Sequence, residues 1–110
     1  MKTGEALIYA TEFSYITASI ASLLGYPALE GVHPLAQSAI FAGMAGALHY
    51  ARTHPENKAF RKALSALYGC LAPLSFTGIQ KWKSYIGDPS ILGPAMALWD
   101  LALAIALLQD

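Results

Sequence analysis

Charged residues are scarce in this chain. Seven of its 110 residues are Lys or Arg and seven are Asp or Glu, so 13% of the chain is charged and the net charge is zero. Ordinary soluble domains carry about 25% charged residues, and a soluble four-helix bundle needs a polar, charged stripe on every helix. A neutral balance also gives no indication of a nucleic-acid partner. The composition therefore favours a membrane protein.

Cysteine and the common catalytic motifs are nearly absent as well. Cys70 is the one cysteine, which excludes an internal disulfide, a paired-cysteine zinc site and covalent haem attachment. We interpret it as a small buried thiol at a helix contact. The sequence has no glycine-rich phosphate loop, no HExxH pair and no GxSxG elbow. We predict no catalytic residue, no cofactor and no metal site, so the chain by itself is not expected to be an enzyme.

Long apolar stretches make up most of what is present. There are four, each close to membrane-spanning length: Leu7–Leu29, Pro34–Ala51, Ala63–Gln80 and Pro89–Gln109. A bilayer core roughly 30 Å thick requires about 20 mostly apolar residues in a helix. The sequence therefore predicts an all-α integral membrane protein with four transmembrane helices in a single domain, 1–110. The first stretch contains Glu12 and no clear cleavage site follows it, so we expect an uncleaved first helix.

The breaks between these stretches contain residues that end or begin helices. Gly25 predicts the end of the first helix, and Pro34 suits the first turn of the second. Thr53 or Asn57 is expected to cap the third helix. Pro73 lies inside that helix, where it predicts a kink.

Basic residues are unevenly distributed between the two membrane faces. If all four helices span, five lie on one face and two on the other: Lys2, Arg52, Lys58, Arg61 and Lys62, against Lys81 and Lys83. The positive-inside rule then places both termini and the second loop on the cytoplasmic or matrix side. Anionic headgroups attract each basic side chain by roughly 1 kcal/mol. A phospholipid such as cardiolipin is therefore expected at Arg52, Lys58, Arg61 and Lys62, with a solvated loop as the alternative.

Small residues form rows along the second stretch. Ala39, Gly43 and Ala47 are spaced four apart, as are Ala42 and Gly46. In lipid, such rows allow two helix backbones to approach closely. We therefore expect Ala39, Gly43, Gly46 and Ala47 to be helix-packing residues and the first two helices to be partners. Gly46→Leu should then disrupt assembly by overpacking. The rows also indicate that much of the surface contacts other subunits of a larger complex.

Three ionisable residues fall inside the apolar stretches, namely Glu12, His49 and Asp100. Such residues are functional candidates by default because intramembrane charge is costly. An up-and-down bundle brings Glu12 and His49 to the same face, where they could form a hydrogen bond. Asp100 lies nearer the midplane, and its partner could be Ser75, Thr77 or a neighbouring chain. We interpret these residues as structural, with proton or ion transfer as the alternative.

Several short stretches also follow one another in the order of a known family. They are residues 17–22, 29–32 and 42–47, the polar loop 52–56, and Gly69-Cys70. In this order they resemble the four-helix accessory subunit of mitochondrial respiratory complex I, which is related to the inner-membrane translocase family. The resemblance covers Thr17 to Cys70. The fourth helix departs from it, with Trp99-Asp100 where the family has a glycine-rich pattern.

The resemblance implies a non-catalytic subunit that packs against core membrane subunits of the proton-pumping oxidoreductase. It implies a cardiolipin-rich mitochondrial inner membrane and a role in stabilising a respiratory supercomplex. It also implies both termini in the intermembrane space, opposite to the charge bias. Two other classes stay open. One is a small ion-coupled transporter, similar in length to the small multidrug-resistance exporters but without their aromatic cage. The other is a holin-like pore-forming oligomer.

Overall fold

A computed structural model of the chain describes residues 3–76, 83 and 85–109. Four α-helices make up most of this part: α1 (Thr3–Leu23), α2 (Pro34–Thr53), α3 (Lys58–Phe76) and α4 (Pro89–Leu108). The prediction of an all-α fold with four helices is confirmed, and each helix overlaps one apolar stretch, although α1 and α3 begin four and five residues before theirs. With 19 to 21 residues each, the helices are about 30 Å long at a rise of about 1.5 Å per residue.

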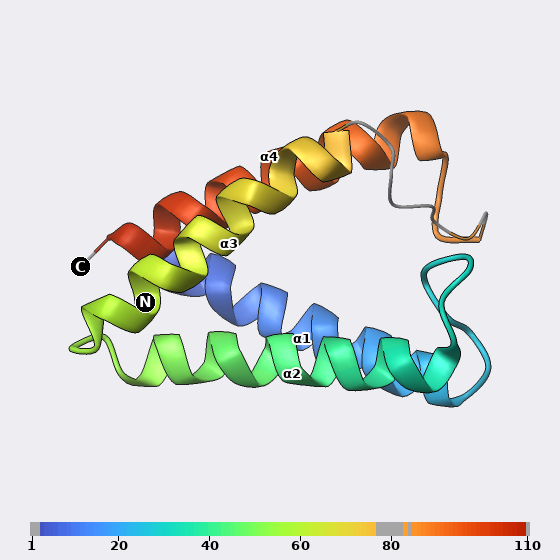
Figure 1. Cartoon of the computed structure of the whole chain (residues 1–110), viewed down its shortest axis with the longest axis horizontal. Helices are drawn as coiled ribbons and strands as arrows, with labels where there is room; N and C mark the ends of the chain where they lie inside the picture. Colours follow the sequence, from blue (N-terminus) through green and yellow to red (C-terminus); the bar gives the residue numbers. More distant parts are fainter. Residues whose placement is uncertain (1–2, 77–82, 84, 110) are drawn as a thin grey trace.

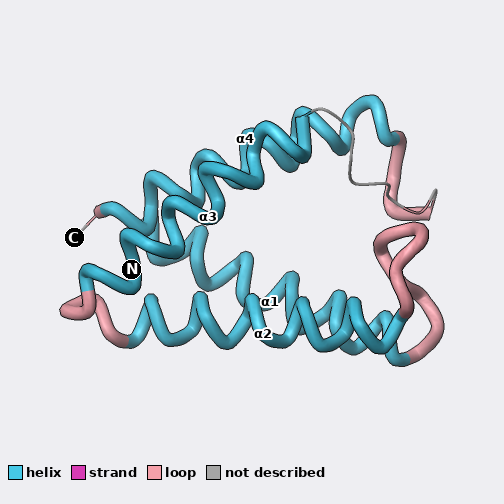
Figure 2. Tube along the Cα trace, in the orientation of Figure 1, coloured by secondary structure: helices cyan, strands magenta, loops and turns pink. Residues whose placement is uncertain are grey.

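The helices form two antiparallel hairpins. α1 packs along α2 and α3 packs along α4, while the two hairpins contact each other mainly through α1 and α4 (Figure 1). The start of α1, the end of α4 and the α2–α3 turn lie at one end of the molecule, as expected for an up-and-down order. The loops after α1 and before α4 lie at the other end (Figure 2). There the Lys83 backbone N–H donates to the Ala28 carbonyl at 2.8 Å, and the Tyr85 hydroxyl donates to the Pro27 carbonyl.

Gly25 ends α1 as predicted. Its φ is +96°, a left-handed conformation that glycine adopts without steric cost. The Tyr26 N–H donates to the Ala21 carbonyl at 2.8 Å and the Gly25 N–H donates to the Ser22 carbonyl at 3.3 Å. This pair of bonds is a Schellman motif, which satisfies carbonyls that the helix itself leaves unpaired.

Local residues also define the starts of α2, α3 and α4. Pro34 is the first residue of α2, as expected, and Asn57 rather than Thr53 caps α3, because its Oδ1 accepts from the Phe60 N–H at 3.1 Å. Asp88 caps α4 by accepting from the Ser90 N–H and hydroxyl. These two hydrogen bonds, the one from the backbone above all, hold the pKa of the Asp88 carboxyl below its usual range.

Large apolar side chains cover much of the outside, whereas many polar side chains are buried. The hydrophobic core lies near the end where the termini meet, and its members are Ile8, Leu48, Ala51, Leu64, Tyr68, Leu103, Ala106 and Leu107. The buried polar and charged residues are Thr11, Glu12, Ser19, Ser22, Gln37, Ser38, Arg61, Ser65 and Ser75. The exposed apolar ones include Phe13, Ile20, Leu24, Leu35, Ile40, Leu67, Phe76, Ile91, Leu98, Ile105 and Leu108.

By length and composition, one helix among the described residues could cross a membrane, and this is α4 over Ser90–Leu108. The hydropathy of α1, α2 and α3 is lowered by their polar residues, many of which are buried. We predicted four membrane-spanning helices, and hydropathy supports this prediction only for α4.

Candidate functional site

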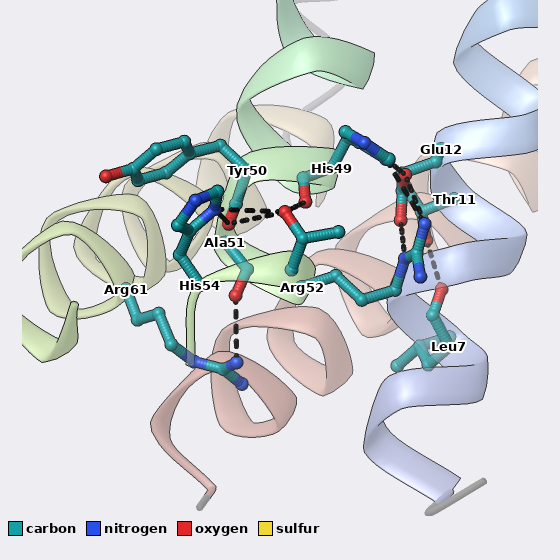
Figure 3. A network of polar contacts seen from close by, with 10 residues as sticks. Leu7, Thr11, Glu12, His49, Tyr50, Ala51, Arg52, His54 and Arg61 are labelled. Atoms are coloured by element: carbon teal, nitrogen blue, oxygen red, sulfur yellow. Dashed lines mark hydrogen bonds and ion pairs between the residues drawn. The ribbon is translucent and has the colours of Figure 1, made fainter. Parts of the chain in front are cut away.

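The predicted contact between Glu12 and His49 is present, and Arg52 also binds the Glu12 carboxylate. Glu12 extends from α1 toward two side chains that are three residues apart on α2 (Figure 3). His49 Nδ1 lies 3.1 Å from Glu12 Oε1, and Arg52 Nε donates to Glu12 Oε2 at 2.6 Å. The Glu12 side chain is only 7% exposed. Because a buried carboxylate needs a partner, the pair with Arg52 explains how this charge is accommodated between two helices.

The guanidinium of Arg52 makes the cluster more than a simple pair. Its Nη2 lies 3.4 Å from Glu12 Oε1 and 3.2 Å from His49 Nδ1, and its Cζ lies 5.0 Å from the centre of the Tyr9 ring. His49 Nδ1 can donate to Glu12 when it carries a proton, or accept from Arg52 when it does not. Glu12, His49 and Arg52, hereafter the Glu12 cluster, thus remain hydrogen-bonded with either imidazole tautomer.

A groove begins at this cluster and continues between α1 and α2. Its volume is about 330 Å³. Its lining residues are Glu12, Ile16, Ser19 and Ile20 of α1 and Ala42, Ala45, Gly46 and His49 of α2. The wall that α2 contributes is formed mostly by alanine and glycine, whose small side chains leave the space unfilled. The groove is therefore polar at the Glu12 cluster and apolar along the rest of its length.

Arg61, predicted to contact lipid, is instead buried at the end where the hairpins meet. Its Nε and Nη2 donate to the Leu107 and Ala106 carbonyls of α4 at 3.0 and 3.2 Å, and its Nη1 donates to the Ala51 carbonyl of α2 at 3.1 Å. These carbonyls lie in the last turns of their helices, which lack intrahelical partners and carry partial negative charge. Arg61 therefore joins three helices.

The predicted basic lipid site is accordingly divided. Arg52 is paired with Glu12, and Arg61 is only 6% exposed. Lys58 and Lys62 are exposed at the start of α3. The expectation that all four residues face lipid headgroups is wrong for Arg61, because the carbonyls at two helix ends bind its guanidinium inside the bundle.

The small-residue rows of α2 also lie elsewhere than expected. α1 and α2 do pack as partners, but through a face of α2 that includes Phe41 and Ala45, while Ala39 and Gly43 are exposed. A Cβ added at Gly43 or Gly46 would meet no atom within 4 Å. Within the described residues, neither glycine is thus a point of close helix contact. Gly46 borders the groove instead.

The close approach of backbones occurs between α3 and α4. A Cβ added at Gly93 would lie 3.0 Å from the Ser75 carbonyl oxygen. Cys70, expected at a helix contact, is exposed instead, because the faces of α3 and α4 that meet are those of Ser75 and Gly93. Gly93 was not predicted, although Gly93 and Ala97 are spaced four apart, as Ala42 and Gly46 are.

Asp100 has a partner within the chain. The Ser75 hydroxyl donates to Asp100 Oδ2 at 3.1 Å, so one of the predicted alternatives is present; Thr77 lies outside the described residues. Two further contacts cross the interior. Trp99 Nε1 donates to the Thr11 hydroxyl at 3.0 Å, linking α4 to α1, and the Tyr68 and Tyr15 hydroxyls lie 3.1 Å apart, linking α3 to α1.

Gln37 is a buried polar residue that the sequence did not single out. It is 1% exposed, and its amide accepts from the Leu29 N–H at 3.0 Å and donates to the Leu29 and Val32 carbonyls at 2.9 and 2.8 Å. All three groups belong to the α1–α2 loop, which Gln37 therefore fixes on α2. The signal available was an uncharged amide near the start of an apolar stretch, directly after a Pro-containing loop.

Within the described ranges, no three His, Cys, Asp or Glu residues gather closely enough to hold a metal ion. The Glu12 cluster and the adjoining groove are therefore the candidate functional site. No protein-family model, curated protein or solved structure matches this chain. The resemblance over Thr17–Cys70 thus stays a prediction.

Proposed function

We propose that this chain is a non-catalytic integral membrane subunit, with all four helices spanning the bilayer, that stabilises a larger membrane complex by helix packing and lipid contact. The observation that carries the proposal is the distribution of polarity, with hydroxyls, an amide and charges on the buried faces and large apolar side chains on the outside.

α1 shows the distribution most clearly. Its Thr11 and Ser19 are 2% and 9% exposed and their hydroxyls are hydrogen-bonded, whereas Phe13 and Leu23 are 65% and 60% exposed. In water, burying hydroxyls and exposing large apolar side chains are both unfavourable, because the hydroxyls lose their hydration and the apolar area is not removed from water. In lipid, the same arrangement is favourable, because polar groups find partners only inside the protein and apolar side chains can face the lipid. This argument applies to α1 although hydropathy alone does not select it.

The positions of the charges agree with a spanning arrangement. From Phe13 to Leu23 in α1 and from Pro34 to Leu48 in α2 there is no charged residue. Arg52 lies near the end of α2 and Arg61 near the start of α3, at one end of the bundle, and Glu30, Lys83 and Asp88 belong to the loops of the opposite end. Glu12 and Asp100, near the middle of α1 and of α4, are the exceptions, and Arg52 and the Ser75 hydroxyl bind them.

The exposed small residues of α2 support the role as a subunit. Ala39 and Gly43, which lie outside the groove, are exposed, and in lipid such surfaces favour close packing with a further helix. That helix would belong to another chain of the complex. The narrower assignment, an accessory subunit of mitochondrial respiratory complex I in a cardiolipin-containing inner membrane, rests on the resemblance over Thr17–Cys70 alone.

The contacts of Glu12 disfavour the transporter alternative. A carboxylate that exchanges protons for a substrate must be able to release its charge partner, whereas Arg52 contacts both oxygens of Glu12. Glu12 is therefore better suited to joining α1 and α2 than to coupling ion movement.

Extraction and sizing of the full chain test the proposal. We expect the chain to stay in the membrane pellet after an alkaline carbonate wash and, in mild detergent, to migrate with a much larger assembly on a native gel. Release by carbonate would contradict the membrane placement. A free oligomer that supports Glu12-dependent proton flux in vesicles containing only this protein would replace the subunit by the transporter. Migration with the respiratory complexes specifically tests the narrower assignment.

A further inference from the structure

The groove between α1 and α2 has the polarity of a lipid site. Its polar end is lined by Glu12 and His49, and from there it extends toward Ile20. The eight helical rises between Glu12 and Ile20 correspond to about 12 Å along the helix axis. The groove therefore lies parallel to the helices and, if these span, parallel to the acyl chains of the bilayer.

Glu12 and His49 line the polar end and Arg52 adjoins it, and the two nitrogen-bearing side chains are more exposed than the carboxylate. The His49 side chain is 62% exposed and that of Arg52 is 22% exposed, against 7% for Glu12. Among the described residues, neither His49 Nε2 nor Arg52 Nη1 has a hydrogen-bond partner, because the bonds of these side chains involve Nδ1, Nε and Nη2. A ligand at this end meets two N–H groups, one of them on a guanidinium, which suit an anionic phosphate oxygen.

We propose that this groove binds one anionic phospholipid, with an acyl chain between Ile20 and Gly46 and the phosphate on His49 and Arg52. The inference rests on the proposed membrane placement and adds a defined ligand site to it. Lipid tails are as apolar as the groove itself, so an acyl chain gains little by leaving bulk lipid. Preference for this lipid over its neighbours must then come from the phosphate contacts, which makes the charge of the headgroup the selective property.

A direct test is native mass spectrometry of the full chain with phosphatidylglycerol and with phosphatidylcholine of identical acyl chains. We expect one tightly retained lipid and a preference for phosphatidylglycerol. Removing one basic contact should lower that preference about fivefold. His49→Gln replaces the basic imidazole by a neutral amide without removing either member of the Arg52–Glu12 pair. Lys62→Gln is its control, because Lys62 is an exposed basic residue outside the groove.

The steric part of the proposal has its own matched pair. Gly46→Leu fills the groove, whereas Gly43→Leu adds the same side chain one turn away on the same helix, where Gly43 lines no part of the groove. We expect Gly46→Leu to lose the retained lipid and Gly43→Leu to keep it, with helical circular dichroism unchanged in both. Equal lipid retention by the two variants would overturn the proposal, as would a loss of preference in Lys62→Gln as large as in His49→Gln.

Two further outcomes are distinguishable. If the protein is a dimer that Gly46→Leu dissociates while lipid retention is unchanged, a second copy of the chain occupies the groove and the lipid proposal is wrong. If the chain is released by carbonate and stays soluble without detergent, the membrane placement fails and the lipid site fails with it. If the chain resists carbonate extraction and Gly46→Leu retains as much lipid as the wild type, the lipid site is refuted while the membrane placement stands.

Discussion

The two hairpins of this molecule use small residues in opposite ways. In α3–α4, Gly93 lies against the Ser75 backbone so closely that an added Cβ would lie 3.0 Å from its carbonyl oxygen. In α1–α2, Gly46 borders an open groove of about 330 Å³ and has no neighbour near its Cβ position. The contacts that join α1 to α2 there are polar, such as the Ser19 hydroxyl that donates to the Ser38 carbonyl at 2.9 Å.

This difference shows that a glycine row does not by itself identify a packing surface. α2 has the stronger small-residue pattern, yet the closest backbone approach involves an isolated glycine of α4. In lipid, polar contacts can hold two helices together without close packing along the whole interface. The α1–α2 hairpin therefore has space for a ligand, whereas the α3–α4 hairpin is closed at Gly93.

The largest effect is expected where the hairpins join. Arg61→Met removes hydrogen bonds to carbonyls of α2 and α4, and the loss of several charge-assisted bonds should lower the free energy of unfolding by about 3 kcal/mol. Lys62→Met, at the exposed neighbouring position, should change it by less than about 0.5 kcal/mol. Denaturation of both variants in the same detergent measures the difference. Similar stabilities would show that Arg61 does not join the hairpins.

The second prediction compares the two glycines directly. Gly93→Leu forces a side chain against the Ser75 carbonyl and should lower the free energy of unfolding by about 1–3 kcal/mol through overpacking. Gly46→Leu enters open space and should cost less than about 0.5 kcal/mol, contrary to what the α2 row alone predicts. Thermal unfolding of both variants in detergent separates them. If Gly46→Leu lost more stability than Gly93→Leu, the α1–α2 hairpin would be the more closely packed of the two, contrary to this account.

A smaller effect is expected at Asp100, which joins α3 to α4. Asp100→Asn keeps an acceptor for the Ser75 hydroxyl and should leave the stability of the bundle nearly unchanged. Asp100→Leu removes the acceptor and should lower the free energy of unfolding by about 1 kcal/mol. The same unfolding assay and the yield of assembled complex are the readouts. Equal behaviour of the two variants would mean that the hydrogen bond contributes nothing to assembly.

The smallest effect is a dependence on pH at the start of α4. Because the hydrogen bonds from Ser90 lower the pKa of the Asp88 carboxyl in the folded chain, its charged cap stabilises the fold above the pKa of an unfolded Asp, about 3.9. That contribution is lost as the pH falls through the lower, folded pKa. Asp88→Asn keeps a capping side chain but removes its charge. The wild-type chain should therefore be slightly more stable than this variant at pH 7, and the two should be equally stable in strong acid. A constant difference across pH would contradict this.

The sequence predicted the helices better than the contacts between them. The helix boundaries could be predicted from the sequence because they depend on local backbone conformation and capping, at Gly25, Pro34 and Asn57. Glu12 and His49 could be paired because an up-and-down order places them at one end. The pairing partner of Arg52 could not, since charge counting treats every loop-proximal basic residue as a surface residue.

Burial of Arg61 and exposure of Gly43 were missed for one physical reason. Helical periodicity tells which residues share a face of a helix, but not which neighbouring helix that face meets. Whether carbonyls of two other helix ends converge on Arg61 depends on how the hairpins join, which no local pattern specifies.

The central claim, that the apolar outside of the bundle faces lipid, is tested most directly by the single cysteine. Cys70 lies inside α3 and is exposed on the protein surface. In opened membrane vesicles, a water-soluble maleimide should leave Cys70 unlabelled until the membrane is dissolved in SDS. The introduced thiol of the double variant Cys70→Ala/Glu56→Cys, in the exposed α2–α3 turn, should react at once. Labelling of Cys70 without detergent, at the rate of that turn control, would show that α3 faces water and would contradict the account.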